Sequence, residues 1–512
     1  MATPALFLNA LSIVLGSFQY GHHIGELNSP QKVITTCADP HTGADIPSSP
    51  LYGTEPSDGS LPLCIPMTSS EWSVLVATLT IGGLLGSLFV GARLADRFGR
   101  RTALMANNAS LALGSLIMGC ASTYSAMLVG RFLIGVGCGA VTVIVPMYLA
   151  EVSPPELRGT LGVMNQLGIV LGILFSQVLG LYFSTATGWR VILMTGVGLS
   201  LLQVVLLPLC VESPRYLALQ PGGAVKAKRA LQILRGRQDV AKEIRDWTRQ
   251  DERSLAAEEE GLVGASPLLN DSNEALLGED TEQQSQHQHK TFNALSGGQG
   301  ISVAEFITYP RYRRPAIILL VVQLSQQLSG INGVMFYSTA IMSTIMPSQS
   351  AMITVYISIV NVFMTLISAY LMDKAGRRTL LMTSSVAMGA SSFVLATSLN
   401  YEIPLLSAIS IIAFVASFAL GLGPIPFLII PEVVDTTAVA SASAFALSVN
   451  WSTNFVVSVM FLKLQEWWGG NVFYVFALLL GGLTTAIHRI VPETRGKTAE
   501  EVARSWQPSH AH

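Results

Sequence analysis

The chain has 512 residues, of which 50% are hydrophobic and only 12% carry a charge. Ordinary soluble domains carry about 25% charged residues, so the composition excludes a typical soluble protein. Apolar runs of roughly 20 residues recur along the chain and indicate an all-α protein that crosses a membrane many times. The formal net charge of −2 gives no electrostatic indication of a nucleic-acid partner.

The first half, residues 1–213, contains six apolar runs that we expect to span the membrane. The first run has no basic segment and no small-residue cleavage site, so we predict a retained helix rather than a signal peptide. A loop rich in Pro, Ser and Gly follows it and holds Cys37 and Cys64, which are predicted to pair if the loop faces an oxidising compartment. The six predicted helices are 6–26, 72–94, 102–121, 126–149, 161–183 and 191–209.

A polar segment, residues 214–312, separates the two halves, and no run in it is apolar enough to span a bilayer. Residues 225–249 show the spacing of an amphipathic helix, and residues 254–300 are predicted to be disordered. The second half, residues 313–491, contains six further predicted helices, and a short polar tail, 492–512, ends the chain. These helices are 315–346, 351–372, 380–398, 404–430, 439–464 and 472–490.

The most polar membrane segment is residues 323–337, QLSQQLSGINGVMFY. Gln323, Gln326 and Gln327 are spaced i, i+3 and i+4, so they share one helix face. Because an unsatisfied amide in lipid costs several kcal/mol, that face must look inward. Gly330 and Gly333 predict a break in the helix, which is tolerated where the chain lines a cavity. Amides donate and accept hydrogen bonds, which suits an uncharged polyhydroxyl ligand.

Three features recur in both halves and predict two parallel six-helix repeats. The motif DRFGRR (96–101) returns as DKAGRR (373–378), Glu151 corresponds to Glu432, and Glu212 corresponds to Glu493. The arginines beside these features all fall on one side of the predicted topology. By the positive-inside rule this side is cytoplasmic, so both termini are expected there.

Taken together, these residues resemble the sugar porter family of the major facilitator superfamily, close to facilitative hexose transporters, over nearly the whole chain. The likeness implies twelve transmembrane helices, hexose transport by alternating access, a functional monomer in a lipid bilayer, and neither a cofactor nor enzymatic activity. The resemblance lies in GSFQYGHHIGELNSPQK (16–32), DRFGRR (96–101), PMYLAEVSPPELRG (146–159), NQLGIVLGI (165–173), ESPR (212–215), QLSQQLSGINGVMFYS (323–338), DKAGRR (373–378), GPIPF (423–427), NWSTNF (450–455) and PETRGKT (492–498).

The resemblance implies a sugar site built mainly from the second half. Amides would bind the sugar hydroxyls, and aromatic or aliphatic faces would cover the apolar side of the ring. The positions carried over are Gln166, Ile169, Ile173, Gln326, Gln327, Asn332, Asn361, Phe427, Glu432, Asn450, Trp451 and Asn454.

It also implies a cytoplasmic latch of ion pairs between the repeats, which would be closed in the outward-facing state. The alternative is that these charges only orient the helices in the membrane and keep the loops soluble. The latch positions are Asp96, Arg100, Glu151, Arg158, Glu212, Arg215, Asp373, Arg377 and Glu432.

Three departures from the family pattern bear on function. Phe427 stands where a tryptophan is usual, so the aromatic side chain expected over the sugar has no indole N–H to donate. Residues 435–440 lack the usual Gly-Pro-Arg-Pro, so one latch arginine is missing. His23 stands where facilitative members have Asn and proton symporters have Asp; it is spaced i, i+3 from Glu26, and the two could share a proton. The alternative is a neutral His23 near the outer mouth, with Glu26 reaching water.

Two other functions stay open at this point. A proton-coupled sugar or polyol symporter would use His23 and Glu26. A non-transporting sugar receptor is disfavoured because such proteins tend to carry long cytoplasmic tails. The histidines of the polar segment have no acidic partners at metal-ligand spacing, so no metal site is predicted. The wording YGHHIGELN is also similar to a fungal vacuolar subgroup, and the membrane is therefore predicted to be either the plasma membrane or a vacuolar or endolysosomal one.

Overall fold

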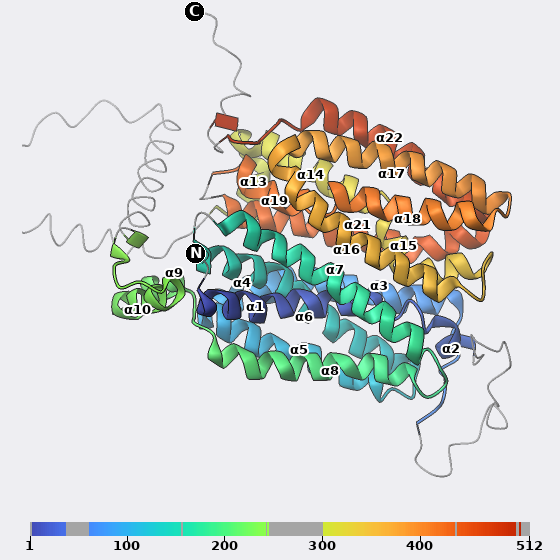
Figure 1. The fold of residues 1–512 in the computed structure, drawn as a ribbon, viewed down its shortest axis with the longest axis horizontal. Coiled ribbons are helices and arrows are strands. Elements are labelled where there is room, and N and C mark those ends of the chain that lie inside the picture. Colours follow the sequence, from blue (N-terminus) through green and yellow to red (C-terminus); the bar gives the residue numbers. More distant parts are fainter. Residues whose placement is uncertain are drawn as a thin grey trace, which may run out of the picture.

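The computed structural model describes residues 3–36, 61–154, 157–241, 243–244, 301–435, 438–497 and 501–502, without the side chains of 158, 160, 219 and 373. All regular elements in these ranges are helices. They form two elongated bundles that lie side by side, one from each half of the sequence (Figure 1). We call the end of the molecule that carries α10 and α13 the linker end, and the opposite end, which carries α2, the loop end.

The first bundle contains six long helical segments. Its second segment is continuous from α3 through a π-helical stretch, Gly86–Gly91, into α4. The short α2 (Gln31–Thr36) lies at the loop end. The remaining bounds are α1 (Pro4–Gly25), α3 (Ser69–Leu85), α4 (Ala92–Phe98), α5 (Arg100–Gly119), α6 (Tyr124–Val152), α7 (Arg158–Phe183) and α8 (Trp189–Leu206).

The second bundle repeats this arrangement, but two of its six membrane segments are interrupted. The segment predicted at 315–346 divides into α14 (Arg313–Gln327) and α15 (Ile331–Ser343), and the one predicted at 404–430 divides into three pieces. The remaining elements are α16 (Ser350–Ala375), α17 (Arg377–Asn400), α18 (Pro404–Leu420), α19 (Ile425–Leu428), α20 (Ile430–Val433), α21 (Val439–Trp468) and α22 (Val472–Ile490).

The helices agree with the predicted twelve membrane spans. By length and composition, nine segments of the described chain are apolar enough to cross a membrane, and one of them, Val439–Ile490, contains both α21 and α22. The two long helices outside this set are α1, with 22 residues, and α5, with 20. Both are long enough to span a bilayer but are more polar, because they carry the buried polar groups described below.

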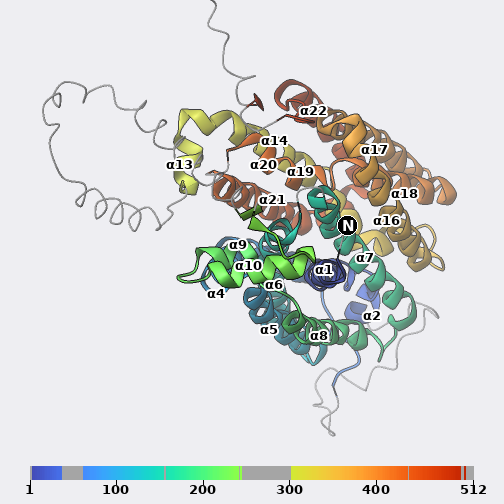
Figure 2. The same ribbon diagram turned by 60° about the vertical axis from the view of Figure 1, so that its left-hand side comes forward.

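Glycines allow close packing between α3 and α6. A Cβ atom on Gly82 would stand 2.4 Å from the Phe132 carbonyl oxygen, and one on Gly86 would stand 2.1 Å from that of Val136. Larger residues would therefore push α3 away from α6. Between the bundles, α3 packs against α21 and α7 packs against α16 (Figure 2).

Glycine also explains the two breaks in the second bundle. Gly330 has φ +84° and begins α15, and a Cβ atom there would be 2.7 Å from the Phe476 ring. This left-handed conformation costs glycine little and other residues more. The second break lies between α18 and α19, at Gly421–Pro424. The predicted break after the glutamines is confirmed.

The polar segment between the halves is helical at both of its described ends. The helix predicted at 225–249 instead ends at Arg235, as α10 (Ala224–Arg235), because Gly236 takes a left-handed φ of +63° and caps it. Two shorter helices, α9 (Pro214–Leu219) and α13 (Val303–Thr308), flank the segment. The stretch 254–300, for which disorder was predicted, lies outside the described residues.

Candidate functional site

The broken membrane segment α14–α15 places a cluster of amides in the interior of the second bundle. Gln323, Gln326 and Gln327 are all 5% exposed or less, so the face predicted to look inward does so. Gln323 donates to the Pro426 carbonyl at 3.0 Å, and Gln326 donates to the Leu422 carbonyl at 2.8 Å. These carbonyls are available because the second break leaves them without helical partners.

The same amides bond to one another and to α21. Asn450 donates to the side-chain oxygens of Gln323 at 2.7 Å and Gln326 at 2.6 Å. Gln327 donates to Asn450 at 3.0 Å, and Asn332 donates to Gln327 at 2.5 Å. Four of the residues predicted to bind sugar, Gln326, Gln327, Asn332 and Asn450, therefore form one hydrogen-bonded network.

Trp451 connects this network to the first bundle. Its side chain is 2% exposed, and its indole N–H has no hydrogen-bond partner within the described part of the chain. The ring lies 5.8 Å from that of Tyr20, and a Cβ atom on Gly83 would meet it at 2.6 Å. Thus Trp451 lies at the boundary between the halves. Phe427 is partly buried on α19, next to the break between α18 and α19.

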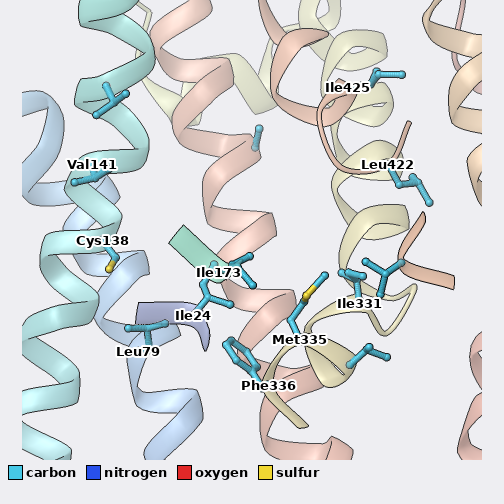
Figure 3. Close-up of a cluster of buried hydrophobic side chains, with 14 of the residues drawn as sticks. Ile24, Leu79, Cys138, Val141, Ile173, Ile331, Met335, Phe336, Leu422 and Ile425 are labelled. Atoms are coloured by element: carbon cyan, nitrogen blue, oxygen red, sulfur yellow. The ribbon is translucent and has the colours of Figure 1, made fainter. Parts of the chain in front are cut away.

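The other predicted site residues lie on the facing helices. Ile173 is buried on α7 among apolar residues of both halves, including Ile24 and Phe336 (Figure 3). Gln166 and Ile169 are partly buried on the same helix. On the second-half side, Asn361 is buried in α16, and Asn454 in α21 accepts a bond from Ser458 at 3.0 Å.

At the linker end the first bundle has a compact ion-pair cluster. Arg100 bonds to Glu151, with 2.8 Å between Nε and Oε2, and lies 3.6 Å from Asp96. Glu212 accepts the backbone N–H groups of Arg100 at 2.9 Å and Arg101 at 3.1 Å. This carboxylate therefore caps the first turn of α5, where the unpaired N–H groups favour a negative charge.

The second bundle repeats the cluster almost group for group. Arg377 pairs with Glu432 at 3.0 Å, and Glu493 accepts the backbone N–H groups of Arg377 at 2.8 Å and Arg378 at 3.2 Å. Thr494 also donates to Glu432, at 2.6 Å. Glu432 thus lies at the linker end rather than among the central amides, and of its two predicted roles we retain only the latch role.

The pairs predicted to join the halves lie within each half in this conformation. Gly99 and Gly376, with φ +89° and +87°, make tight turns that hold each arginine over its own bundle. The side chains of Arg158 and Asp373 fall outside the described residues, and Arg215 is exposed on α9. The prediction of a latch between halves therefore stays a prediction.

The two halves are joined at the loop end. Asn28 donates to the Met335 carbonyl at 3.1 Å and to Ser338 at 2.8 Å, and accepts the backbone N–H of Thr339 at 3.2 Å. These three hydrogen bonds join the residues that follow α1 to α15 across the boundary between the bundles. Cys64 is disulfide-bonded, whereas its predicted partner Cys37 lies outside the described residues.

A second polar cluster is buried inside the first bundle. Glu26 bonds to Arg131 at 2.6 Å and to His23 at 2.9 Å, and all three side chains are fully buried. His22 lies 3.6 Å from Glu26 and 3.0 Å from the Thr195 hydroxyl. The predicted His23–Glu26 contact is confirmed, and the alternative in which Glu26 reaches water is wrong, because Arg131 holds the carboxylate inside.

The donor atoms of His22, His23 and Glu26 lie within 4.8 Å of one another, a spacing that could hold a metal ion. Arg131 already supplies a full positive charge to the same carboxylate. A divalent cation beside it would leave excess positive charge in a buried place, which is strongly unfavourable. We therefore do not assign a metal site to the trio.

Three residues with notable contacts in the structure were not predicted from the sequence. Arg131 was detectable, because a charged residue in an apolar run indicates function by default. Asn28 gave no such signal, because its role depends on a contact with the other half. Asp435, noted only as replacing part of a motif, lies 3.0 Å from Arg311, so this loop has an ion pair of its own.

Known proteins resemble this chain over nearly its whole length. The model of a family described as sugar (and other) transporter matches residues 9–277 and 259–506. The human facilitated glucose transporter member 4 of solute carrier family 2 is 36% identical over 521 residues, covering 98% of this chain and 91% of the relative. A probable metabolite transport protein of Saccharomyces cerevisiae is 32% identical, covering 97% and 94%.

Solved structures also match the fold over nearly the whole chain. The E. coli xylose transporter in a partially occluded inward-open conformation has a TM-score of 0.68 at 20% identity, covering 97% of this chain and all of that one. A proton:xylose symporter bound to 6-bromo-6-deoxy-D-glucose has a TM-score of 0.70 at 20% identity, covering 99% and 100%. These structures share the two-bundle major facilitator fold.

Proposed function

Because this chain belongs to the sugar (and other) transporter family, we propose that it carries a hexose across a membrane by facilitated diffusion and alternating access. The two bundles rock about the central amide network, which is exposed to one side of the membrane at a time. Several relatives are facilitated glucose transporters, which supports a hexose as substrate.

The observation that carries this proposal is the amide network between α14, α15 and α21. Its members satisfy one another when no sugar is bound, so none is left unpaired in the apolar interior. A sugar hydroxyl both donates and accepts, so its binding exchanges an amide–amide bond and the hydroxyl's own bonds to water for amide–sugar bonds. Since bonds are exchanged rather than added, binding stays weak enough for release, as a carrier requires.

The conformation described here is closed at the loop end. Asn28 joins the bundles there, while the ion pairs Arg100–Glu151 and Arg377–Glu432 at the linker end stay within their own halves. We assign it to the inward-facing side of the transport cycle. The linker end is cytoplasmic by the positive-inside rule, and the membrane is the plasma membrane or a vacuolar or endolysosomal one.

Asn28 should control the balance between the two conformations. In Asn28→Ala the three bonds to α15 are lost, at about 1 kcal/mol each, so the equilibrium should move roughly 100-fold toward the outward-open form. Spin labels at Ser69 and Thr344 would report this as a longer distance between the halves. Ser29→Ala is the control, because Ser29 bonds to Gln177 within its own half. Identical distance distributions in the two variants would reject Asn28 as the outer gate.

The linker-end clusters are proposed to stabilise the outward-facing state, in which the halves meet at that end. Arg377→Ala removes a cation that we propose pairs with the first half only when the halves meet at the linker end, so it should favour the inward-facing state roughly fivefold, as expected for loss of one partly exposed ion pair worth about 1 kcal/mol. The same labels would measure the shift, with the exposed Arg489→Ala as control. A shift in the opposite direction would rule out the latch.

One observation favours a second candidate, a proton-coupled symporter. Glu26 is fully buried between a permanent cation, Arg131, and two histidines. Buried ionisable groups in membrane helices commonly lie on proton paths. Protonation of His23 or Glu26 would change the charge next to Asn28, the residue that closes the loop end, and so could connect proton binding to gating.

This candidate makes its own prediction. If coupling occurs, an inward proton gradient should raise sugar accumulation above the outside concentration in the wild type, and His23→Ala should abolish that accumulation while equilibration continues. Accumulation in vesicles with and without the gradient measures it. His488→Ala, an exposed histidine on α22, should behave as the wild type. Accumulation that persists in His23→Ala would remove His23 from the mechanism.

A further inference from the structure

A hollow of about 320 Å³ opens at the linker end, outside the transport path, beside the last turn of α10. It lies beyond the ends of the membrane helices (Figure 1). The lining contains two cationic side chains and no acidic one; its residues are Arg229, Gln232, Ile233, Gly236, Arg237 and Gln238.

Among the described residues, the two cations of this hollow are at most weakly paired. Arg229 is exposed and makes no ion pair with a described residue, and Arg237 comes no nearer than 3.9 Å to Glu243. The charge of Glu243 is already matched by Arg235 at 2.7 Å, and Arg235 also bonds to the Val152 carbonyl. Glu243 is thus shared by Arg235 and Arg237, so the described residues do not fully neutralise the positive charge of the hollow.

The rest of α10 strengthens this field. The helix carries Lys226 and Lys228 in addition to its arginines, and it has no acidic residue. Its inner face, Ala227, Ala230, Leu231 and Leu234, is buried against the bundle. The outer face mixes charge with apolar surface, a composition typical of helices that lie at the level of lipid headgroups.

The spacing of the outer face supports this comparison. Val225, Arg229 and Ile233 follow one another at every fourth position, so they form one stripe along the helix. Val225 is 78% exposed and Ile233 is 45% exposed. The helix follows α8, the last membrane helix of the first half, with only the short α9 between them. Basic clusters immediately after a membrane helix commonly bind anionic lipids.

We propose that this hollow binds the phosphorylated headgroup of an anionic membrane lipid. The guanidinium groups of Arg229 and Arg237 bond to the phosphate oxygens. Gln232 and Gln238 contribute amides for the polar remainder of the headgroup, and Val225 and Ile233 contact the acyl boundary. The lipid thereby holds α10 at the membrane surface, beside the linker end of the membrane-spanning first bundle. This proposal is independent of which sugar is carried.

The test is direct binding to the purified full-length protein in phosphatidylcholine micelles. Short-chain phosphatidylinositol phosphate should raise the melting temperature of the wild type in a saturable manner. Arg229→Gln/Arg237→Gln should weaken binding roughly 30-fold, since each basic residue near an anionic surface contributes about 1 kcal/mol. The matched control is Arg93→Gln/Arg489→Gln, which removes two exposed charges away from the hollow and should bind as the wild type.

The other outcomes contradict the proposal. Equal weakening in both double variants would mean that only the overall charge of the linker end attracts the lipid. Inorganic phosphate or soluble inositol phosphate raising the melting temperature as strongly as the lipid would identify a soluble anion as the ligand. No shift with the phosphorylated lipid beyond that with phosphatidylcholine would mean that the hollow binds no headgroup.

Discussion

Gln327→Ala is expected to lower sugar uptake roughly 10- to 100-fold, because it removes an amide of the proposed sugar site and leaves the amide N–H of Asn332 and the amide oxygen of Asn450 without this partner. Unsatisfied buried polar groups cost about 1–3 kcal/mol each. The loss should be largest at low sugar concentration, where uptake depends on binding. The measurement is initial uptake in vesicles, normalised to inserted protein.

Gln349→Ala provides the matched control. Gln349 is exposed just before α16, and its side chain does not cap that helix. The control should transport as the wild type, and both variants should elute as monodisperse protein in detergent. Wild-type uptake by Gln327→Ala at low sugar would show that the amide network is structural and that the sugar binds elsewhere.

Arg131→Ala is expected to destabilise the folded protein by about 3–5 kcal/mol, the usual cost of leaving a buried charge without its partner. Glu26 would then be a carboxylate with 0% side-chain exposure and only neutral or weakly basic neighbours. The free energy of unfolding in detergent, followed by denaturant titration, measures the effect. Arg489→Ala, which removes an exposed arginine of α22, should leave it within experimental error.

A double variant separates the charge from the packing. In Arg131→Met/Glu26→Gln both charges are removed and the side-chain volumes are nearly kept, so most of the lost stability should return. If this double variant is as unstable as Arg131→Ala, the ion pair is not the reason for the loss, and the cluster around Glu26 would need another explanation.

The sequence was sufficient for the fold because apolar runs of membrane length are an unambiguous signal. The break at Gly330 was also predictable, because two glycines follow closely spaced amides there, and a broken helix is tolerated where it lines a cavity. The early end of α10 was not predicted. The apolar spacing continues past Gly236, and only the backbone shows that this glycine takes a left-handed conformation.

The site was predictable where one helix carries the pattern and not where two helices must meet. Gln323, Gln326 and Gln327 share a face by their spacing alone, and that face is buried as expected. Asn28 resembles any polar loop residue until α15 is placed beside it. The linker-end ion pairs were predicted to join the halves, because sequence identifies the charged groups but not the conformation in which they pair.

The most direct test of the central claim is uptake of labelled D-glucose by liposomes containing the purified protein, with and without an inward proton gradient, and with L-glucose as control. We expect D-glucose, and not L-glucose, to equilibrate at the same rate in both conditions. Accumulation above the outside level only with the gradient would replace facilitated diffusion with proton coupling at Glu26 and His23. Absence of stereoselective uptake of D-glucose or any other hexose would contradict the account and favour a sugar receptor.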